Sequence, residues 1–519
     1  MTSVSADRTG GPPERARSYG LNVLVFCAGV GALATEIAAA RLLAPYYGSS
    51  TVVWANVIGL ILASLSLGYW LGGRLADRRP EPRLLGLIVV GAALLIVAVT
   101  FLSRPLLELS VEGLDRLSTG AVIGSFFAVL FLFAPPVTLL GMVAPFAIRL
   151  SLDDVSDAGA VAGRLYALST IGSLLGTFLS ALVTIPLIGT QRTLLLSAAV
   201  IALPGSLLLS RRWLLAPAAI AVFLAVPPGA IKPQAGLLHE DESLYQYIQV
   251  VERDDARRLY LNEGIAVHSV WREDELLTGG VWDTFLVVPS LLGRRPERVA
   301  ILGNAGGTTA RAMGRFYRET RIDGVELDGA VSEAGRRFFG LEDNPRLEVH
   351  TADARPFLRR ADAEYDLIVV DAYRPPYVPF YLATREFFAL ARDRLAPGGA
   401  IALNVATTPD DHRLAEGIAR TLRSEVPQVV TWQPLRFNQI VIGLDEAVPL
   451  EELRARARSG PAELRELSTL FAEGLSESSA QGRAWTDDRA PVEWITDRMI
   501  VEYGAGGGRF EEAPLPTAP

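Results

Sequence analysis

The chain has 519 residues, of which 50% are hydrophobic and 20% charged, and its formal net charge is −8. This acidic balance argues against a nucleic-acid-binding protein, and the single cysteine, Cys27, excludes disulfide pairs and cysteine-rich metal sites. The mean hydropathy of +0.28 has a local origin, because residues 21–227 hold long apolar runs whereas residues 239–500 resemble an ordinary soluble domain.

The first half of the chain is predicted to be a multi-pass membrane domain. Residues 1–20 are polar and predicted to be disordered. The first apolar run is interrupted by Glu36 and is followed by more such runs, so it reads as a retained helix and not as a cleaved signal. The last run is short enough to be interfacial, so we predict about seven spans, with six or eight as alternatives. The candidate spans lie near residues 21–40, 52–72, 84–102, 120–148, 165–188, 193–210 and 213–227.

Charge gives conflicting signals about orientation. The basic loop at 73–79 and the N-terminal arginines predict cytoplasmic ends, which with seven spans places the following domain outside. We favour a cytoplasmic domain at the cell (inner) membrane, on the chemical grounds of the ligand that the second half of the chain is expected to bind. Glu36 and Arg41 lie near membrane depth and indicate either a transport pathway or, more simply, a salt bridge between helices. There is no GxxxxGK[ST] phosphate loop, so an ATP-driven pump has no support.

The second half is predicted to be an α/β domain. Residues 228–240 form a linker, and residues 241–290 alternate like antiparallel strands, with turns at Asp254–Asp255 and Asn262–Gly264, which predicts a small β-hairpin subdomain. Residues 291–500 hold successive apolar runs that each end in glycines or an acid, as in a Rossmann-like sheet with helices between the strands. The tail, residues 501–519, is predicted to be disordered.

Glycines and acids follow four of these runs. Gly303 and Gly306 let a backbone approach a ligand closely, and Glu326 ends the next run, where a carboxylate can accept both hydroxyls of a ribose. Asp353 and Asp371 end the third and fourth runs. In a doubly wound sheet these positions meet at the carboxyl ends of parallel strands, so the pattern predicts a nucleoside site.

At these residues the second half resembles spermidine synthase, the aminopropyltransferase family with a methyltransferase-like fold. The resemblance lies in LYQYIQV (244–250), GNAGGT (303–308), VELD (325–328), TADA (351–354) and VVDAY (369–373). With TEIAAARLLAPYYG (35–48), TGGVWD (278–283) and TDDRAPVE (486–493), the whole chain is similar to the multi-pass membrane branch of that family.

The resemblance implies an enzyme that uses S-adenosylmethionine or its decarboxylated form as co-substrate, with no prosthetic group and no metal. It implies that Glu326 holds the ribose, Asp353, beside the small Ala354, the adenine, and Gln246 the sulfonium arm. A sulfonium cation also favours a nearby carboxylate such as Asp371, which we take as the candidate catalytic residue. Its partners would be the nucleoside, an amine or amino-acid acceptor and the lipid bilayer, and the resemblance implies oligomers such as a homodimer.

Two positions depart from the family pattern. Ala305 stands where the glycine loop normally has an aspartate, and Arg374 stands where the family has its catalytic aspartate. Arginine cannot accept a proton from an amine, so classical spermidine synthesis is in doubt. Asp371 could serve as base instead, with Tyr373, Tyr377 or Asp283 positioning the acceptor, or Arg374 could bind a substrate carboxylate.

Several alternatives follow. The same nucleoside could undergo intramolecular cyclisation or elimination, or donate its methyl group, since fold does not fix function. The chain could also be a transporter with a nucleoside-sensing domain, or an inactive binding module. The four histidines lack metal-ligand spacing and are read as surface or packing residues, and Asp487 and Asp488 as capping or ionic residues.

Overall fold

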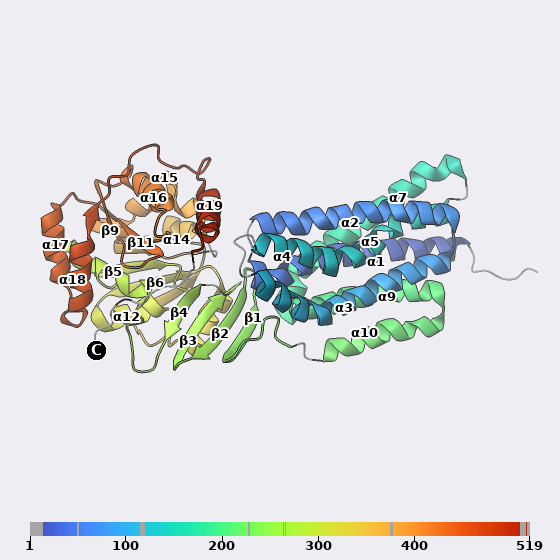
Figure 1. Cartoon of the computed structure of the whole chain (residues 1–519), viewed down its shortest axis with the longest axis horizontal. Coiled ribbons are helices and arrows are strands. Elements are labelled where there is room, and N and C mark those ends of the chain that lie inside the picture. Colours follow the sequence, from blue (N-terminus) through green and yellow to red (C-terminus); the bar gives the residue numbers. More distant parts are fainter. Residues whose placement is uncertain are drawn as a thin grey trace, which may run out of the picture. The chain divides into compact units, whose positions relative to one another are not determined.

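The computed structural model describes residues 14–48, 51–114, 120–152, 154–226, 229–262, 264, 266–373, 377–508 and 515. The chain divides into two compact units, residues 1–233 and residues 234–519 (Figure 1). The division falls within the predicted linker at 228–240.

Unit 1 is a bundle of apolar helices. Helix α1 begins at Glu14, before the predicted start at residue 21. Short π-helical segments, Val129–Phe133 and Ser180–Thr184, join α4 to α5 and α7 to α8. The helices are α1 (Glu14–Tyr47), α2 (Thr51–Arg78), α3 (Pro82–Leu114), α4 (Gly120–Ala128), α5 (Ala134–Gly141), α6 (Val143–Ser151), α7 (Ala158–Leu179), α8 (Ile185–Ile188), α9 (Thr190–Leu209) and α10 (Leu215–Ala225).

Six helical stretches in the described part of unit 1 are long and apolar enough to cross a membrane. The run predicted at 213–227 forms α10, whose 11 residues fall short of the roughly 20 that a spanning helix needs. Helix length therefore gives six candidate spans, one of the alternatives to the predicted seven. The six are Tyr19–Tyr47, Val53–Arg78, Pro82–Ser110, Ile123–Ser151, Val155–Ile188 and Thr190–Leu209.

The two ends of this bundle are fixed by polar contacts. At the end where α1 begins, Arg149 of α6 pairs with Asp77 of α2 at 3.6 Å. At the end where α1 finishes, the Tyr46 hydroxyl donates to the Ile231 carbonyl at 2.6 Å, and Lys232 Nζ donates to the Pro45 carbonyl at 2.7 Å. Helix α10 runs back along α9 in Figure 1, and the segment that follows α10 thus reaches the far end of α1.

Unit 2 begins with a four-stranded antiparallel sheet in the order β1-β2-β3-β4. Its strands are β1 (Leu237–Glu242), β2 (Tyr247–Arg253), β3 (Ala256–Leu261) and β4 (Val267–Trp271), so it begins slightly before the predicted subdomain. The β2–β3 turn falls where predicted, since Asp254 and Asp255 adopt φ of 51° and 55°, as a tight hairpin turn requires.

The larger sheet of unit 2 has eight strands in the order β12-β10-β11-β9-β8-β5-β6-β7. The strands from β9 to β7 in this order pair in parallel, while β11, β10 and β12 are antiparallel additions. They are β5 (Arg298–Leu302), β6 (Arg321–Glu326), β7 (Leu347–Thr351), β8 (Tyr365–Val370), β9 (Leu395–Ala406), β10 (Gln428–Trp432), β11 (Asn438–Leu444) and β12 (Ser476–Glu477).

Helices cover both faces of this sheet, which confirms the predicted Rossmann-like fold. One apolar core joins the sheet to α12, α17 and α18, and another joins it to α14, α15, α16 and α19. Helix α13 instead packs against β2 and β3 of the small sheet. The helices of unit 2 are α11 (Val281–Thr284), α12 (Thr308–Phe316), α13 (Gly329–Phe338), α14 (Ala354–Arg360), α15 (Arg385–Arg392), α16 (Arg413–Arg423), α17 (Leu450–Arg458), α18 (Arg465–Gly474) and α19 (Val492–Ala505).

The strand order reverses between β5 and β8. The chain proceeds from β5 outward through β6 to β7, then returns to place β8 on the other side of β5. The connections after β5 and β8 therefore diverge and leave a crevice at the carboxyl edge, where α/β sheets of this kind bind their ligands. The predicted tail, 501–519, starts inside α19, and its residues 509–514 and 516–519 lie outside the described part of the chain.

Candidate active site

The predicted glycines and acids gather at the carboxyl edge of the parallel strands. Gly303 directly follows β5, and Glu326 is the last residue of β6. Asp353 follows β7 by two residues, and Asp371 directly follows β8. The structure thus brings these four predicted residues to one edge of the sheet, around the crevice between β5 and β8.

The glycine loop after β5 is shaped by residues with positive φ. Gly303 has a φ of 92°, and a Cβ at this position would lie 2.5 Å from the Asp371 carbonyl oxygen. Gly307, with a φ of 87°, precedes α12 as its N-cap. Ala305 also adopts a left-handed conformation, with a φ of 45°, which is strained for a residue with a side chain. The loop therefore folds back tightly over the start of the crevice.

Glu326 is held by backbone groups on both sides. It is 9% exposed, and its carboxylate accepts from the backbone N–H of Ala305 at 2.9 Å and of Asp328 at 3.1 Å. Burial raises the pKa of Glu326 to about 7, although these donors oppose the shift. A carboxylate oriented in this way keeps lone pairs free to accept ribose hydroxyls.

The small sheet is tied to the same edge by two serines. Ser243, in the turn between β1 and β2, donates to Asp328 at 2.5 Å and accepts from the Gln246 backbone N–H at 3.0 Å. Ser269 of β4 accepts from the backbone N–H of Gly306 at 2.8 Å. The turn that carries Gln246 is therefore attached two residues beyond Glu326, beside the glycine loop.

Asp353 begins α14 as its N-cap. One carboxylate oxygen accepts from the backbone N–H of Arg355 at 3.0 Å, and the other accepts from the Tyr381 hydroxyl at 3.0 Å. Ala354, which is buried, follows directly. Both bonds fix the carboxylate without using all of its lone pairs, so it can still accept from an exocyclic amine.

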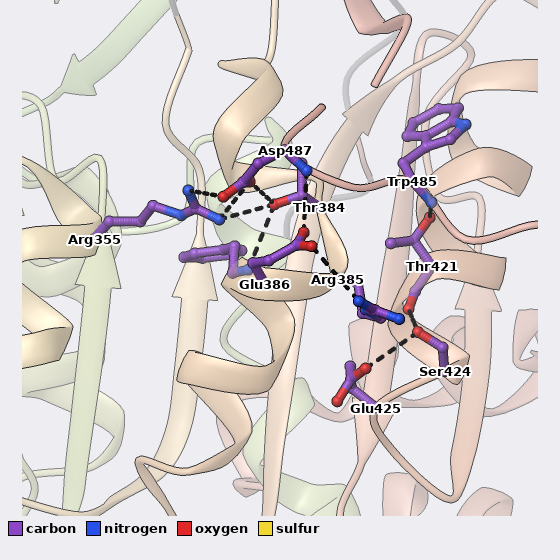
Figure 2. A network of polar contacts seen from close by, with 10 residues as sticks. Arg355, Thr384, Arg385, Glu386, Thr421, Ser424, Glu425, Trp485 and Asp487 are labelled. Carbon is purple, nitrogen blue, oxygen red and sulfur yellow. Dashed lines mark hydrogen bonds and ion pairs between the residues drawn. The ribbon is translucent and has the colours of Figure 1, made fainter. Parts of the chain in front are cut away.

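A polar network also holds the first turn of this helix (Figure 2). The Arg355 guanidinium donates to both carboxylate oxygens of Asp487, at 3.0 and 2.8 Å, and also to the Thr384 hydroxyl. Thr384, the N-cap of α15, donates to Asp487 at 2.7 Å. Asp487 is therefore an ionic latch between α14 and α15, in agreement with its sequence interpretation.

Asp371 is paired with an amide on the neighbouring strand. Its carboxylate accepts from Asn404 Nδ2 of β9 at 2.9 Å, and burial raises its pKa to about 7 against this donor. The Tyr373 hydroxyl donates to the Asn404 carbonyl at 3.0 Å, and burial followed by the charge of Asp371 raises the pKa of Tyr373. Arg374 lies outside the described residues.

Two residues considered for the acceptor side are bonded within the protein. Asp283 is 2% exposed, and its carboxylate accepts from the backbone N–H groups of Thr278 and Gly279 and from the Thr278 hydroxyl. Burial raises the pKa of Asp283 to about 6. The Tyr377 hydroxyl donates to Asp497 of α19 at 2.5 Å. These contacts support a structural role for Asp283 in the turn before α11.

Sequence reasoning missed a possible cation cluster and several supporting residues. Ligand atoms of Asp323, Glu348 and His350 lie within 4.8 Å of one another, but Asp323 is already paired with Arg298 at 2.7 Å. The missed supporting residues are polar side chains at the ends of strands or turns near the crevice. They are Asn404, Asn438, Ser243 and Ser269. Asn404 could have been identified from the sequence, because it is a polar residue that follows the buried run AIAL.

Comparisons with known proteins give a family match for part of unit 2. Residues 283–433 match the family model described as spermine/spermidine synthase domain. A probable polyamine aminopropyl transferase of Bifidobacterium longum (strain NCC 2705) is 32% identical over 297 residues, which cover 52% of this chain and 65% of that protein. The polyamine aminopropyltransferase of Vibrio vulnificus (strain CMCP6) is 32% identical over 191 residues, covering 35% of this chain and 64% of that protein.

The chain thus spans just under two thirds of the length of these two curated relatives. The crystal structure of a probable spermidine synthase from Corynebacterium glutamicum ATCC 13032 is 20% identical, covers 49% of this chain and 97% of that chain, and superposes with a TM-score of 0.38.

Proposed function

We propose that unit 2 is an aminopropyltransferase-like enzyme, because residues 283–433 match the spermine/spermidine synthase family model. It would act on decarboxylated S-adenosylmethionine, or on S-adenosylmethionine itself, and release methylthioadenosine. The names of the two relatives, both polyamine aminopropyltransferases, support this class of reaction.

One observation carries the proposal: three carboxylates lie at the carboxyl ends of parallel strands of one sheet, beside the point where the strand order reverses. Glu326 beside the glycine loop would accept the ribose hydroxyls, and Asp353 at the start of α14 would accept the adenine amino group. Asp371, across the strand reversal, would face the sulfonium, and Gln246 would lie along its arm. The close approach of Gly303 to the Asp371 backbone supports a compact site of this kind.

The chemistry proposed for this site is a displacement at carbon. A neutral amine attacks the methylene group next to the sulfonium, so that a carbon–nitrogen bond forms while the carbon–sulfur bond breaks. The electron pair of the broken bond goes to sulfur, which leaves as the neutral thioether of methylthioadenosine. The amine proton passes to Asp371, whose pKa of about 7 suits a general base near neutral pH.

We also propose that unit 1 holds the enzyme in a cell membrane. Its long helices leave large apolar side chains exposed, among them Leu62, Phe178 and Leu187, at 54%, 60% and 76% exposure. Exposure of this extent along several helices of about 20 or more residues would be unfavourable in water and is typical of lipid-facing surfaces.

The decisive experiment is mass spectrometry of detergent-purified full-length protein. It would be incubated separately with S-adenosylmethionine and with the decarboxylated nucleoside, each with and without putrescine. We expect methylthioadenosine and an aminopropylated amine only when the decarboxylated nucleoside and an amine are both present. Methylthioadenosine without an acceptor would indicate intramolecular displacement, and adenosylhomocysteine would indicate methyl transfer.

Variants assign the chemistry to the site. Asp371→Asn and Glu326→Gln are expected to lose most activity, by roughly 10²- to 10⁴-fold for a general base. Glu364→Gln is the matched control, because Glu364 is an exposed acid at the opposite, amino-terminal end of β8. Turnover that survives both site substitutions would refute the assignment.

A further inference from the structure

We propose that Asn404 is a positioning residue that holds the Asp371 carboxylate toward the reacting amine, through a relay of amides that starts at Asn438. The inference rests on the proposed function only in the role that it gives to Asp371. Asn404 belongs to the carboxyl-terminal part of β9, and Asn438 begins the antiparallel neighbour β11. The relay therefore joins three adjacent strands across the crevice edge.

The contacts form a continuous chain. Asn438 Nδ2 donates to Asn404 Oδ1 at 2.8 Å, and Asn404 Nδ2 donates to Asp371 Oδ1 at 2.9 Å. Asn404 is only 6% exposed, so its amide depends on these partners more than on water. Each link has the length of a good hydrogen bond.

The direction of the relay follows from Asp371 itself. An ionised carboxylate can only accept hydrogen bonds, so Asn404 must turn its amino group toward it. The carbonyl oxygen of Asn404 then faces away and needs a donor, which Asn438 supplies. A flipped Asn404 would place its carbonyl oxygen against the carboxylate and its amino group against that of Asn438. The orientation of Asn404 is therefore fixed from both sides.

The backbone of Asn404 contributes a second restraint. Its carbonyl oxygen accepts from the Tyr373 hydroxyl at 3.0 Å. A single residue of β9 thus holds both Asp371 and Tyr373, the first and third residues after β8. These two residues lie just before residues 374–376, which are outside the described part of the chain. Asn404 consequently fixes the position of Asp371 and the start of the segment that follows it.

Electrostatics predicts what the relay does to reactivity. Burial raises the pKa of Asp371, and the Asn404 donor lowers it, to a balance of about 7. Without that donor the pKa would rise further, so less carboxylate would be present at neutral pH. Tyr373 is the other titratable group that interacts with Asp371 among the described residues, and its own pKa is raised, so it stays neutral from pH 6 to 9.

The test replaces each amide of the relay with an apolar side chain in the full-length protein. Asn404→Leu removes the donor to Asp371, and Asn438→Leu removes only the anchor of Asn404. Gln439→Leu is the matched control, because it is the same kind of change at the next residue of β11, whose side-chain oxygen is buried without a hydrogen-bond partner among the described residues. Affinity for decarboxylated S-adenosylmethionine and for methylthioadenosine is measured from pH 5.5 to 9, together with the rate.

We expect Asn404→Leu to shift the pH midpoint of binding for the cationic nucleoside upward by about one unit or more. Its rate should fall roughly fivefold or more at pH 7 and recover toward the control at pH 9. Asn438→Leu should cause a smaller shift in the same direction. For the neutral methylthioadenosine, the Asn404→Leu and Gln439→Leu proteins should show the same pH dependence of binding, because that ligand has no charge to interact with Asp371.

A merely structural role predicts a different result: equal losses at every pH and for both nucleosides, which would overturn the proposal. An unchanged midpoint in Asn404→Leu would overturn it as well. The Asp371→Asn background provides a second check, because the pH-dependent effect of Asn404→Leu should vanish there. All binding readouts are independent of turnover, so absence of aminopropyl transfer in the unmodified protein would refute the proposed function and leave this inference testable.

Discussion

Binding of the nucleoside should be coupled to loss of protons from two carboxyl groups. Burial raises the pKa of both Glu326 and Asp371 to about 7 in the ligand-free chain. Ribose hydroxyls can donate to Glu326, and a sulfonium cation attracts Asp371, so each interaction favours the ionised form. Raising the pH through 7 should therefore strengthen binding, and each carboxyl group should contribute separately to the gain in affinity.

The size of the effect follows from these values. A group with a pKa of about 7 is roughly one-tenth ionised at pH 6 and nine-tenths ionised at pH 8, so it changes the affinity about tenfold, or about 1.4 kcal/mol. Decarboxylated S-adenosylmethionine uses both carboxylates and should bind up to about 100-fold more tightly at pH 8 than at pH 6. Methylthioadenosine lacks the cation, so its affinity should rise only about tenfold, through Glu326 alone.

Isothermal titration calorimetry at both pH values, in buffers with different ionisation enthalpies, measures affinity and proton release together. Asp371→Asn should make the two nucleosides respond alike to pH, and Glu326→Gln should remove most of the response to methylthioadenosine. Affinities that do not change between pH 6 and 8, with no proton released, would refute the reasoning.

The same pKa values predict how stability depends on pH without ligand. Each folded-state pKa lies above the ordinary value of 4.5 for Glu326 or 3.8 for Asp371. The folded protein therefore binds more protons than the unfolded chain between about pH 4 and 7, and stability falls as pH rises through this window. Asp371→Asn should lessen that fall, measured as the unfolding temperature of the ligand-free protein at pH 5 and pH 8.

Two further substitutions test the frame of the site. Gly303→Ala should lower the unfolding temperature and abolish nucleoside binding. Gly303 has a left-handed backbone conformation, and a Cβ there would lie 2.5 Å from a backbone oxygen. Gly329→Ala is the control and should behave like the unchanged protein, because the nearest atom to its Cβ would lie at 3.6 Å. Asp487→Asn should weaken nucleoside binding severalfold and lower the free energy of unfolding by about 1 kcal/mol, a modest value because the bidentate pair with Arg355 is partly exposed. The neighbouring Asp488→Asn should change neither quantity. Equal effects of both substitutions in binding assays would contradict the role of Asp487 in joining α14 to α15.

The sequence was sufficient for the part of the site that follows strand periodicity. Gly303, Glu326, Asp353 and Asp371 each end an apolar run, and parallel strands place such ends at one edge. The two-domain organisation could be predicted for a similar reason, because composition changes sharply at the linker.

Contacts between residues far apart in sequence could not be predicted. Asn404 is 33 residues from Asp371, and Asp487 is 132 residues from Arg355, so no local pattern marks either pair. Asp283 remains a predicted acceptor-side residue, and its contacts within the protein were not predictable either. In the structure its carboxylate bonds to the turn at Thr278–Gly279, which a spacing argument cannot reveal.

The hydrogen bond between Tyr46 and Ile231 bears on how many times the chain passes along the helix bundle. A chain that begins at one end of a bundle and leaves at the other has passed along it an odd number of times. The return of the chain to the far end of α1 therefore needs α10 and the residues after it in addition to the six candidate spans, although α10 itself has only 11 residues. The structure corrects the predicted basic loop at 73–79, because residues 73–78 are the last turns of α2, at the end of the bundle where Asp77 pairs with Arg149. In a bilayer, the rule that places positively charged ends in the cytoplasm would put that end of the bundle on the cytoplasmic side and the exit of the chain at Lys232 on the opposite side.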